Sequence, residues 1–254
     1  MINPELHTQP VALDRVGHRA LKLSEGANSL TRVTQLNSMF LTLAEFGDAA
    51  KEFPIFFLRA GKDDKGHELV APVAVFGLKQ GQNLFVEGSG ADTRWKARYT
   101  PALMRAYPFT MARVSEEQLA VCIDQSFDGW SQTEGRALFD DKGEPTELLN
   151  SARDFVERIE NEVERTRLAG QRLMELKLLQ EKRFDATLPD GSPLRVDGFL
   201  ALDEERFNKL TDAEALELHR TGLAGVLHAH LISMSNMTAL IERQLAQSPA
   251  AAAA

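Results

Sequence analysis

Residues 53–76 read FPIFFLRAGKDDKGHELVAPVAVF, two apolar runs separated by a charged segment with two glycines. Apolar runs of this length on both sides of a glycine-containing turn predict a β-hairpin, with strands at 53–58 and 69–76. Working outward, two further apolar stretches are predicted to be short strands, at 83–86 and 118–124. The first half of the chain is therefore predicted to be rich in β-structure.

The character of the sequence changes near Pro145, where helical periodicity begins. Thr146 is suited to cap a helix, and apolar residues then recur in steps of three and four. They are Leu149, Ala152, Phe155, Ile159, Val163, Thr166, Leu173 and Leu176. This spacing predicts one long amphipathic helix from 147 to about 180, with a charged face opposite the apolar one.

Beyond this helix, residues 183–202 read as a second hairpin around Pro189-Asp190-Gly191-Ser192. Thr211 and Glu214 have the spacing of a capping box, and Gly222 is suited to end the helix that the box begins. A last helix is predicted from 223 to 245, followed by a disordered tail at 248–254.

The fold class predicted from these patterns is α+β. Residues 1–145 form a β-rich half, and residues 146–254 form a mainly helical half that includes the hairpin at 183–202. No internal repeat and no long Gly/Ser linker separates them. The two halves are therefore expected to share one core.

Composition excludes several classes of protein. The 254 residues include 29 Lys and Arg against 37 Asp and Glu, a formal net charge of −8. Such a balance argues against a nucleic-acid partner, which requires a concentrated basic surface. The single cysteine, Cys122, excludes an intramolecular disulfide and a zinc site built from several thiolates.

The sequence also bears on location. Neither a signal peptide nor an apolar segment long enough to span a membrane is visible, which predicts a soluble, cytoplasmic protein. Export by a dedicated system that reads a non-cleaved signal stays open.

Catalytic signatures are absent: the chain has no P-loop, dinucleotide-binding glycine motif, nucleophile elbow or H-E-x-x-H sequence. Its one histidine pair, His228-Ala229-His230, is predicted to lie on a helix, where the two side chains point about 200° apart. His230 falls on the apolar stripe and is interpreted as a hydrogen-bonded core histidine, with a role as a metal ligand as the weaker alternative. We predict no cofactor.

The segment from Trp95 to Phe109 concentrates aromatic and basic residues. Aromatic faces and guanidinium groups together suit an anionic or sugar-like ligand. The candidate binding residues are Trp95, Arg98, Tyr99, Arg105, Tyr107 and, outside the segment, Glu134. The favoured interpretation of the segment is nevertheless structural: the aromatic rings pack the β-rich half while Arg98 and Arg105 pair with its surplus carboxylates.

At this segment the chain starts to resemble the SapC family of bacterial proteins, which are associated with a surface-layer locus. The matching stretches run in order along nearly the whole chain: 53–57, 95–109, 131–140 with Gly143 and Pro145-Thr146, 202–205 and 230–237. The resemblance implies a role at the cell envelope, the surface layer or outer-membrane nutrient uptake. It implies no catalytic residues.

Three functions remain open from the sequence. The leading hypothesis is a soluble accessory protein that binds a partner protein or a small ligand for an envelope or uptake system. The second is an enzyme whose acid–base or metal site draws on Arg98, Tyr99, Glu134, Asp140 and His230. The third is a structural surface-layer component that self-assembles as a homo-oligomer through the helix at 147–180.

Overall fold

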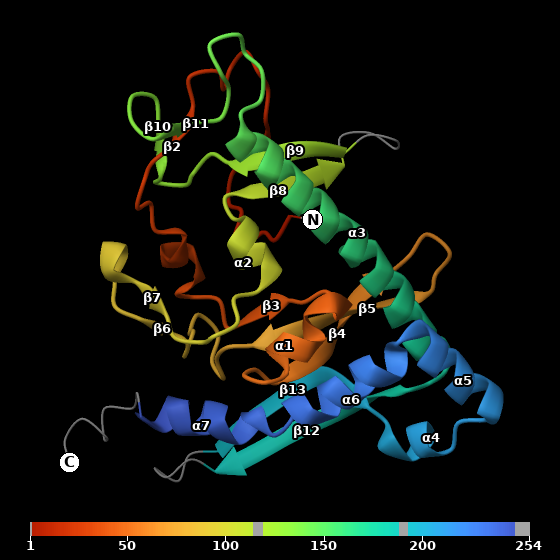
Figure 1. The fold of residues 1–254 in the computed structure, drawn as a ribbon. Coiled ribbons are helices and arrows are strands. Elements are labelled where there is room, and N and C mark those ends of the chain that lie inside the picture. Colours follow the sequence, from red (N-terminus) through yellow and green to blue (C-terminus); the bar gives the residue numbers. More distant parts are fainter. Residues whose placement is uncertain (1, 114–118, 188–192, 247–254) are drawn as a thin grey trace. The chain divides into compact units, whose positions relative to one another are not determined.

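The computed structural model describes residues 2–113, 119–187 and 193–246 (Figure 1). Its fold class is α+β, as predicted, with a strand-rich first half and helices toward the C-terminus. The chain divides into two compact units. The first comprises Met1–Thr34, Val86–Lys96 and Ala102–Val163, and the second comprises Gln35–Phe85, Ala97–Pro101 and Glu164–Ala254. The boundary near residue 145 and the single shared core stay predictions.

The second unit is built on a five-stranded antiparallel sheet with the order β12-β13-β4-β5-β3. Its strands are β3 (Ser38–Phe40), β4 (Ile55–Lys62), β5 (Glu68–Val75), β12 (Leu179–Thr187) and β13 (Pro193–Leu202). The predicted hairpin is confirmed as β4 and β5, with Ile55 opposite Ala74. The second predicted hairpin is confirmed in its strands β12 and β13, whereas its turn at 188–192 lies outside the described residues. Through the pairing of Leu200 with Phe57, it extends the sheet of the first hairpin.

The long predicted helix is observed as α3 (Glu147–Glu175), and Oγ1 of Thr146 accepts a hydrogen bond from the amide of Leu149 at its start. The predicted end near 180 was wrong, because Lys177 adopts a left-handed conformation with φ 54°. The amide of Leu178 then bonds to the carbonyl of Leu173 at 2.9 Å, and that of Lys177 to Met174 at 3.0 Å. These two bonds form a Schellman motif, which closes the helix and directs the chain into β12.

Four more helices complete the second unit at the C-terminal end of the chain. They are α4 (Glu204–Asn208), α5 (Asp212–Thr221), α6 (Leu223–Ser233) and α7 (Asn236–Ala246). The capping box of Thr211 and Glu214 is present, and Gly222 ends α5 with φ 79°, both as predicted. Figure 1 shows α6 beside β4 and β13 of the sheet, with which it makes contact.

The single helix predicted for 223–245 was wrong, since it is interrupted between α6 and α7. The hydroxyls of Ser233 and Ser235 donate to the carbonyls three residues back, His230 and Ile232, at 2.6 and 2.8 Å. Serine side chains that bond to backbone carbonyls of the preceding turn compete with the helical ladder and bend it. The tail predicted for 248–254 lies outside the described residues.

The described part of the first unit contains three small antiparallel sheets. Their strands are β1 (Pro10–Ala12), β2 (Lys22–Leu23), β6 (Val86–Glu87), β7 (Arg94–Trp95), β8 (Phe109–Arg113), β9 (Leu119–Asp124), β10 (Trp130–Ser131) and β11 (Arg136–Ala137), in the orders β1-β9-β8, β10-β2-β11 and β6-β7. The helix α2 (Ala102–Ala106) and the first part of α3 belong to the same unit. The strand predicted for 118–124 is confirmed as β9.

The strand predicted for 83–86 was wrong except at Val86, which begins β6. Oδ1 of Asn83 accepts a hydrogen bond from the amide of Phe85 at 2.9 Å, and this local bond forms a turn. Within residues 2–113, 119–187 and 193–246, none of the helices has the length and apolar character that a membrane crossing requires.

Candidate functional site

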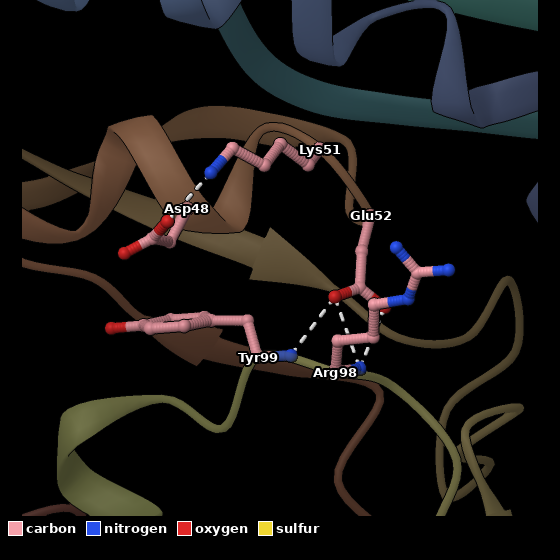
Figure 2. A pocket seen from close by; sticks show the side chains of 5 residues that line it. All are labelled: Asp48, Lys51, Glu52, Arg98 and Tyr99. Atoms are coloured by element: carbon pink, nitrogen blue, oxygen red, sulfur yellow. Dashed lines mark hydrogen bonds and ion pairs between the residues drawn. The ribbon is translucent and has the colours of Figure 1, made fainter.

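The second unit contains an open hollow beside the short helix α1 (Phe46–Ala49). Its volume is about 730 Å³, within the range of small-molecule sites. The side chains that line it are Asp48, Lys51, Glu52, Arg98 and Tyr99 (Figure 2). Two of these, Arg98 and Tyr99, belong to the binding residues predicted from the sequence.

Glu52 holds the segment that carries Arg98 and Tyr99. The backbone amide of Arg98 donates to both carboxylate oxygens of Glu52, at 3.0 and 2.8 Å. The amide of Tyr99 donates to Oε1 of Glu52 at 2.9 Å. Hydrogen bonds to an ionised acceptor are stronger than neutral ones. The carboxylate of Glu52 therefore fixes the backbone of two ligand candidates against the end of α1, as Figure 2 shows.

The ring of Tyr99 is anchored at its far end by a buried carboxylate. Its hydroxyl donates to Oε1 of Glu45 at 2.9 Å, and Glu45 is only 6% exposed. The other oxygen of Glu45 accepts from the amide and the hydroxyl of Thr42, at 2.8 and 2.9 Å, which is the capping box of a short 3-10 helix, Leu43–Glu45. Tyr99 thus presents its ring, and not a free hydroxyl, to the hollow.

The remaining charged groups of the hollow are more exposed. Nζ of Lys51 lies 2.8 Å from Oδ1 of Asp48, one turn away, and both side chains are about two-thirds exposed (69% and 64%). Exposed ion pairs of this kind contribute about 0–1 kcal/mol. Among the residues that the structure describes, none bonds to or pairs with the guanidinium of Arg98.

The other predicted binding residues lie in the first unit. Tyr107 is buried and donates its hydroxyl to Asp124 at 3.1 Å. The guanidinium of Arg105 lies over the ring of Phe155, 5.2 Å from its centroid. Trp95 is half-buried on β7, and Glu134 is exposed in the loop between β10 and β11. Of the six, Arg98 and Tyr99 line the hollow beside α1.

Three lining residues, Asp48, Lys51 and Glu52, were not found from the sequence. The spacing of Asp48 and Lys51 indicates only a helical ion pair. The contact of Glu52 with residues 98 and 99 spans more than forty positions of the chain and leaves no local pattern. A partner at this sequence separation is outside the reach of motif analysis.

His230 is a structural residue, as the sequence predicted. It has no exposed surface, its Nδ1 donates to the carbonyl of Ile55 at 2.8 Å, and its Nε2 accepts from the amide of Leu202 at 3.1 Å. Burial lowers the pKa of His230 to about 4. With both ring nitrogens engaged by backbone groups, it has no lone pair for a metal. No group of three or more potential metal ligands occurs among the described residues.

A second hollow, of about 380 Å³, lies in the first unit between residues 24–31, 90–91 and 127–129. Its amide side chain, Asn28, donates to the carbonyls of Ala91 and Thr93 and accepts from the amide of Leu30. Asn28 therefore serves the local fold. This hollow contains none of the predicted binding residues and is the weaker candidate.

A family model described as SapC matches residues 13–240. No curated protein and no solved structure matches the chain.

Proposed function

Since the chain belongs to the SapC family, we propose that it is an accessory binding protein of a bacterial envelope, surface-layer or outer-membrane uptake system. In this proposal the protein holds a small ligand or a segment of a partner and catalyses no reaction. The family resemblance supports the envelope context, and the hollow beside α1 supports the binding role.

One observation carries the assignment of the site. The hollow combines a guanidinium without a bonded partner among the described residues with an aromatic ring whose hydroxyl is already engaged. Arg98 is thus available for an acidic group, and Tyr99 contributes an aromatic ring to the lining of the hollow. Glu52 holds both residues in place through their backbone amides.

The geometry also argues against the hollow as an acid–base centre. Of the groups in the hollow that could transfer protons, the hydroxyl of Tyr99 and the carboxylate of Glu52 are occupied in hydrogen bonds of the fold, and Asp48 is paired with Lys51. General acid–base catalysis requires such groups to be within hydrogen-bond reach of a substrate. Arg98 remains as a binding group, which favours recognition over chemistry.

The test is native mass spectrometry of the full chain purified gently from its own host. We expect wild-type protein to carry an additional small molecule or partner, and the Arg98→Ala variant to lose it. Trp95→Ala combined with Arg98→Ala tests the wider segment. Arg153→Ala, which removes an exposed arginine on α3, is the matched control and is expected to retain the bound species.

Circular dichroism establishes that each variant is folded. Retention of every bound species by folded Arg98→Ala and by the double variant would contradict the proposal. Equal loss in Arg153→Ala would contradict it as well, because the effect would then follow from surface charge and not from the hollow.

A further inference from the structure

The last two helices of the second unit carry a long run without charge. Residues 221–241 contain no Asp, Glu, Lys or Arg, although these types make up 26% of the chain. The inner side of α6 contacts α1, β4 and β13, and it buries Leu223 and Leu227. Its other side carries Ile232, which is 65% exposed. A helix that is apolar on all sides is expected to be covered on all sides, so the side with Ile232 lacks the cover that its composition requires.

The exposed residues of α6 and α7 follow a regular spacing, and Figure 1 shows α7 continuing in roughly the same direction as α6. Exposed positions recur in alternating steps of three and four residues, at Gly225, His228, Ile232, Ser235, Ala239 and Glu242. We call these six positions the α6–α7 face. Alternating steps of three and four are the spacing with which one helix faces another in a coiled-coil pair. The α6–α7 face is therefore suited to a partner that is itself a helix.

Two charged residues at the ends of the uncharged run indicate which helix that is. Arg220, in the last turn of α5, comes just before the run, and Glu242 on α7 follows it. Both side chains are exposed, and neither has a hydrogen bond or an ion pair with another described residue. Ile232 lies about midway between them along the chain. The run thus has a free cation at one end, a free anion at the other and an exposed apolar residue at its centre.

This arrangement is complementary to itself. When two copies of one helix pair antiparallel about a two-fold axis, their midpoints meet at the axis and each end faces the opposite end of the other copy. Ile232 then meets its own copy, and Arg220 meets Glu242 of the second copy at both ends. The formal charge of −8 makes two copies repel each other, so a face without charge at its centre is the one at which they can approach.

We propose that the chain forms a homodimer through the α6–α7 face, with the two copies antiparallel, Ile232 at the two-fold axis and Arg220 of each copy opposite Glu242 of the other. The inference concerns a surface other than the hollow beside α1, so it goes beyond the proposed function and does not depend on it. One helix face about 35 Å long is smaller than the interface of an obligate dimer. The dissociation constant is therefore expected to be on the order of micromolar.

The first test is sedimentation velocity of the full chain from about 1 μM to about 300 μM. We expect the mass to rise from that of one chain to that of two. Ile232→Glu places two carboxylates together at the axis and is expected to weaken the dimer about tenfold or more. Leu168→Glu is the matched control, because it makes the same change at a leucine on α3 that is 52% exposed, and it should leave the dimer unchanged. Circular dichroism establishes that each variant is folded.

A charge exchange tests the antiparallel pairing. Arg220→Glu and Glu242→Arg each place like charges opposite one another at both ends, so each is expected to weaken the dimer about fivefold. In an equal mixture of the two variants, opposite charges face each other again at both ends. The mixture is therefore expected to form a heterodimer with about the wild-type affinity. A parallel pair would not be weakened by either single substitution, because its ends already face like charges.

Four results would overturn the proposal. The first is the mass of a single chain at every concentration. The second is a dimer that Ile232→Glu leaves intact or that Leu168→Glu weakens equally, since the contact would then lie elsewhere, for example on α3. The third is a dimer that Ile232→Glu weakens but the two charge substitutions do not. The fourth is a monomer that binds phosphatidylcholine vesicles and loses this binding in Ile232→Glu, which would assign the α6–α7 face to a membrane surface.

Discussion

The hydroxyl of Tyr107 donates to Oδ2 of Asp124 at 3.1 Å, and Asp124 has no exposed surface. The same carboxylate accepts from the amides of Thr8, Gln9 and Ser126, at 3.3, 3.0 and 3.1 Å. Burial, followed by the charge of Asp124, raises the pKa of Tyr107. Although burial alone would raise the pKa of Asp124, its hydrogen bonds hold it below the ordinary value. One carboxylate thus ties the N-terminal segment of the first unit to β9.

We therefore expect Asp124→Asn to destabilise the protein by about 2–4 kcal/mol, because an amide nitrogen cannot accept the bonds made to one carboxylate oxygen. Urea unfolding followed by the fluorescence of the two tryptophans measures the change. Asp128→Asn alters an exposed carboxylate in the loop that follows β9 and should stay within about 0.5 kcal/mol of wild type. Equal effects of the two substitutions would show that Asp124 does not have this role.

Two helical glycines of the second unit provide a matched pair. A Cβ added to Gly170 on α3 would lie 2.9 Å from Cγ2 and 3.0 Å from the backbone oxygen of Val70, on β5. Alanine at this position is expected to destabilise the protein by about 1–3 kcal/mol, since the helix must move off the sheet. Gly225 on α6 has nothing within 4 Å of the corresponding point.

Gly225→Ala should therefore stabilise the protein by about 0.5–1 kcal/mol through helix propensity alone. A lower melting temperature for Gly170→Ala and a higher one for Gly225→Ala would confirm that α3 crosses β5 at close range. A stabilised Gly170→Ala variant would argue against that crossing.

The sequence predicted those elements whose signals are local. The hairpin at 53–76, the capping box of Thr211 and the core role of His230 each follow from residues within one turn or one strand. The end of α3 was missed because Lys177, a residue without the usual signature of a left-handed C-terminal position, occupies the place where glycine is expected. Ser233 and Ser235 interrupt the last helix through side-chain bonds that the apolar stripe does not reveal.

Only the part of the candidate site that has a local sequence signal could be predicted. Arg98 and Tyr99 were found because aromatic and basic residues cluster in the segment that contains them. Their neighbours in the hollow come from α1 and the residues after it, and Glu52 is joined to them only by tertiary hydrogen bonds. The joining of β13 to β4 had no sequence signal either, because strand pairing between distant segments depends on the whole sheet.

The buried imidazole of His230 predicts a dependence of stability on pH. Its pKa is lowered by burial to about 4, from 6.5 in the unfolded chain. Between these values the unfolded chain binds a proton that the folded chain does not, so the free energy of unfolding falls as the pH falls from 6.5 to 4. Above pH 6.5 this contribution does not change with pH.

Through His230, the free energy of unfolding falls by roughly 3 kcal/mol between pH 6.5 and pH 4. His230→Gln should be less stable at neutral pH, because it loses imidazole hydrogen bonds, but its stability should fall less steeply below pH 6.5. Burial also lowers the pKa of His7, so part of the slope remains in the variant. Urea titrations at a series of pH values measure how steeply the free energy of unfolding depends on pH in the wild type and in the variant. An imidazole signal of His230 that titrates near 6.5 in the folded protein would contradict the assignment.

Glu52 is predicted to be a positioning residue for the hollow. Glu52→Ala removes the acceptor for the amides of Arg98 and Tyr99, so we expect both amides to exchange with solvent faster, by about tenfold. Because Arg98 then loses its fixed backbone, binding of the native ligand should fall as it does in Arg98→Ala. The free energy of unfolding should fall by no more than about 1–2 kcal/mol.

Glu52→Gln distinguishes positioning from charge, because its amide oxygen, in the place of Oε1, can still accept from the backbone amides of both Arg98 and Tyr99. We expect slow exchange and most of the binding to return in this variant, although the negative charge is gone. Hydrogen exchange measured by NMR at the two amides and ligand occupancy measured by native mass spectrometry are the readouts. Binding lost equally in Glu52→Gln and Glu52→Ala, with slow exchange retained in the glutamine variant, would assign Glu52 a direct electrostatic contact with the ligand.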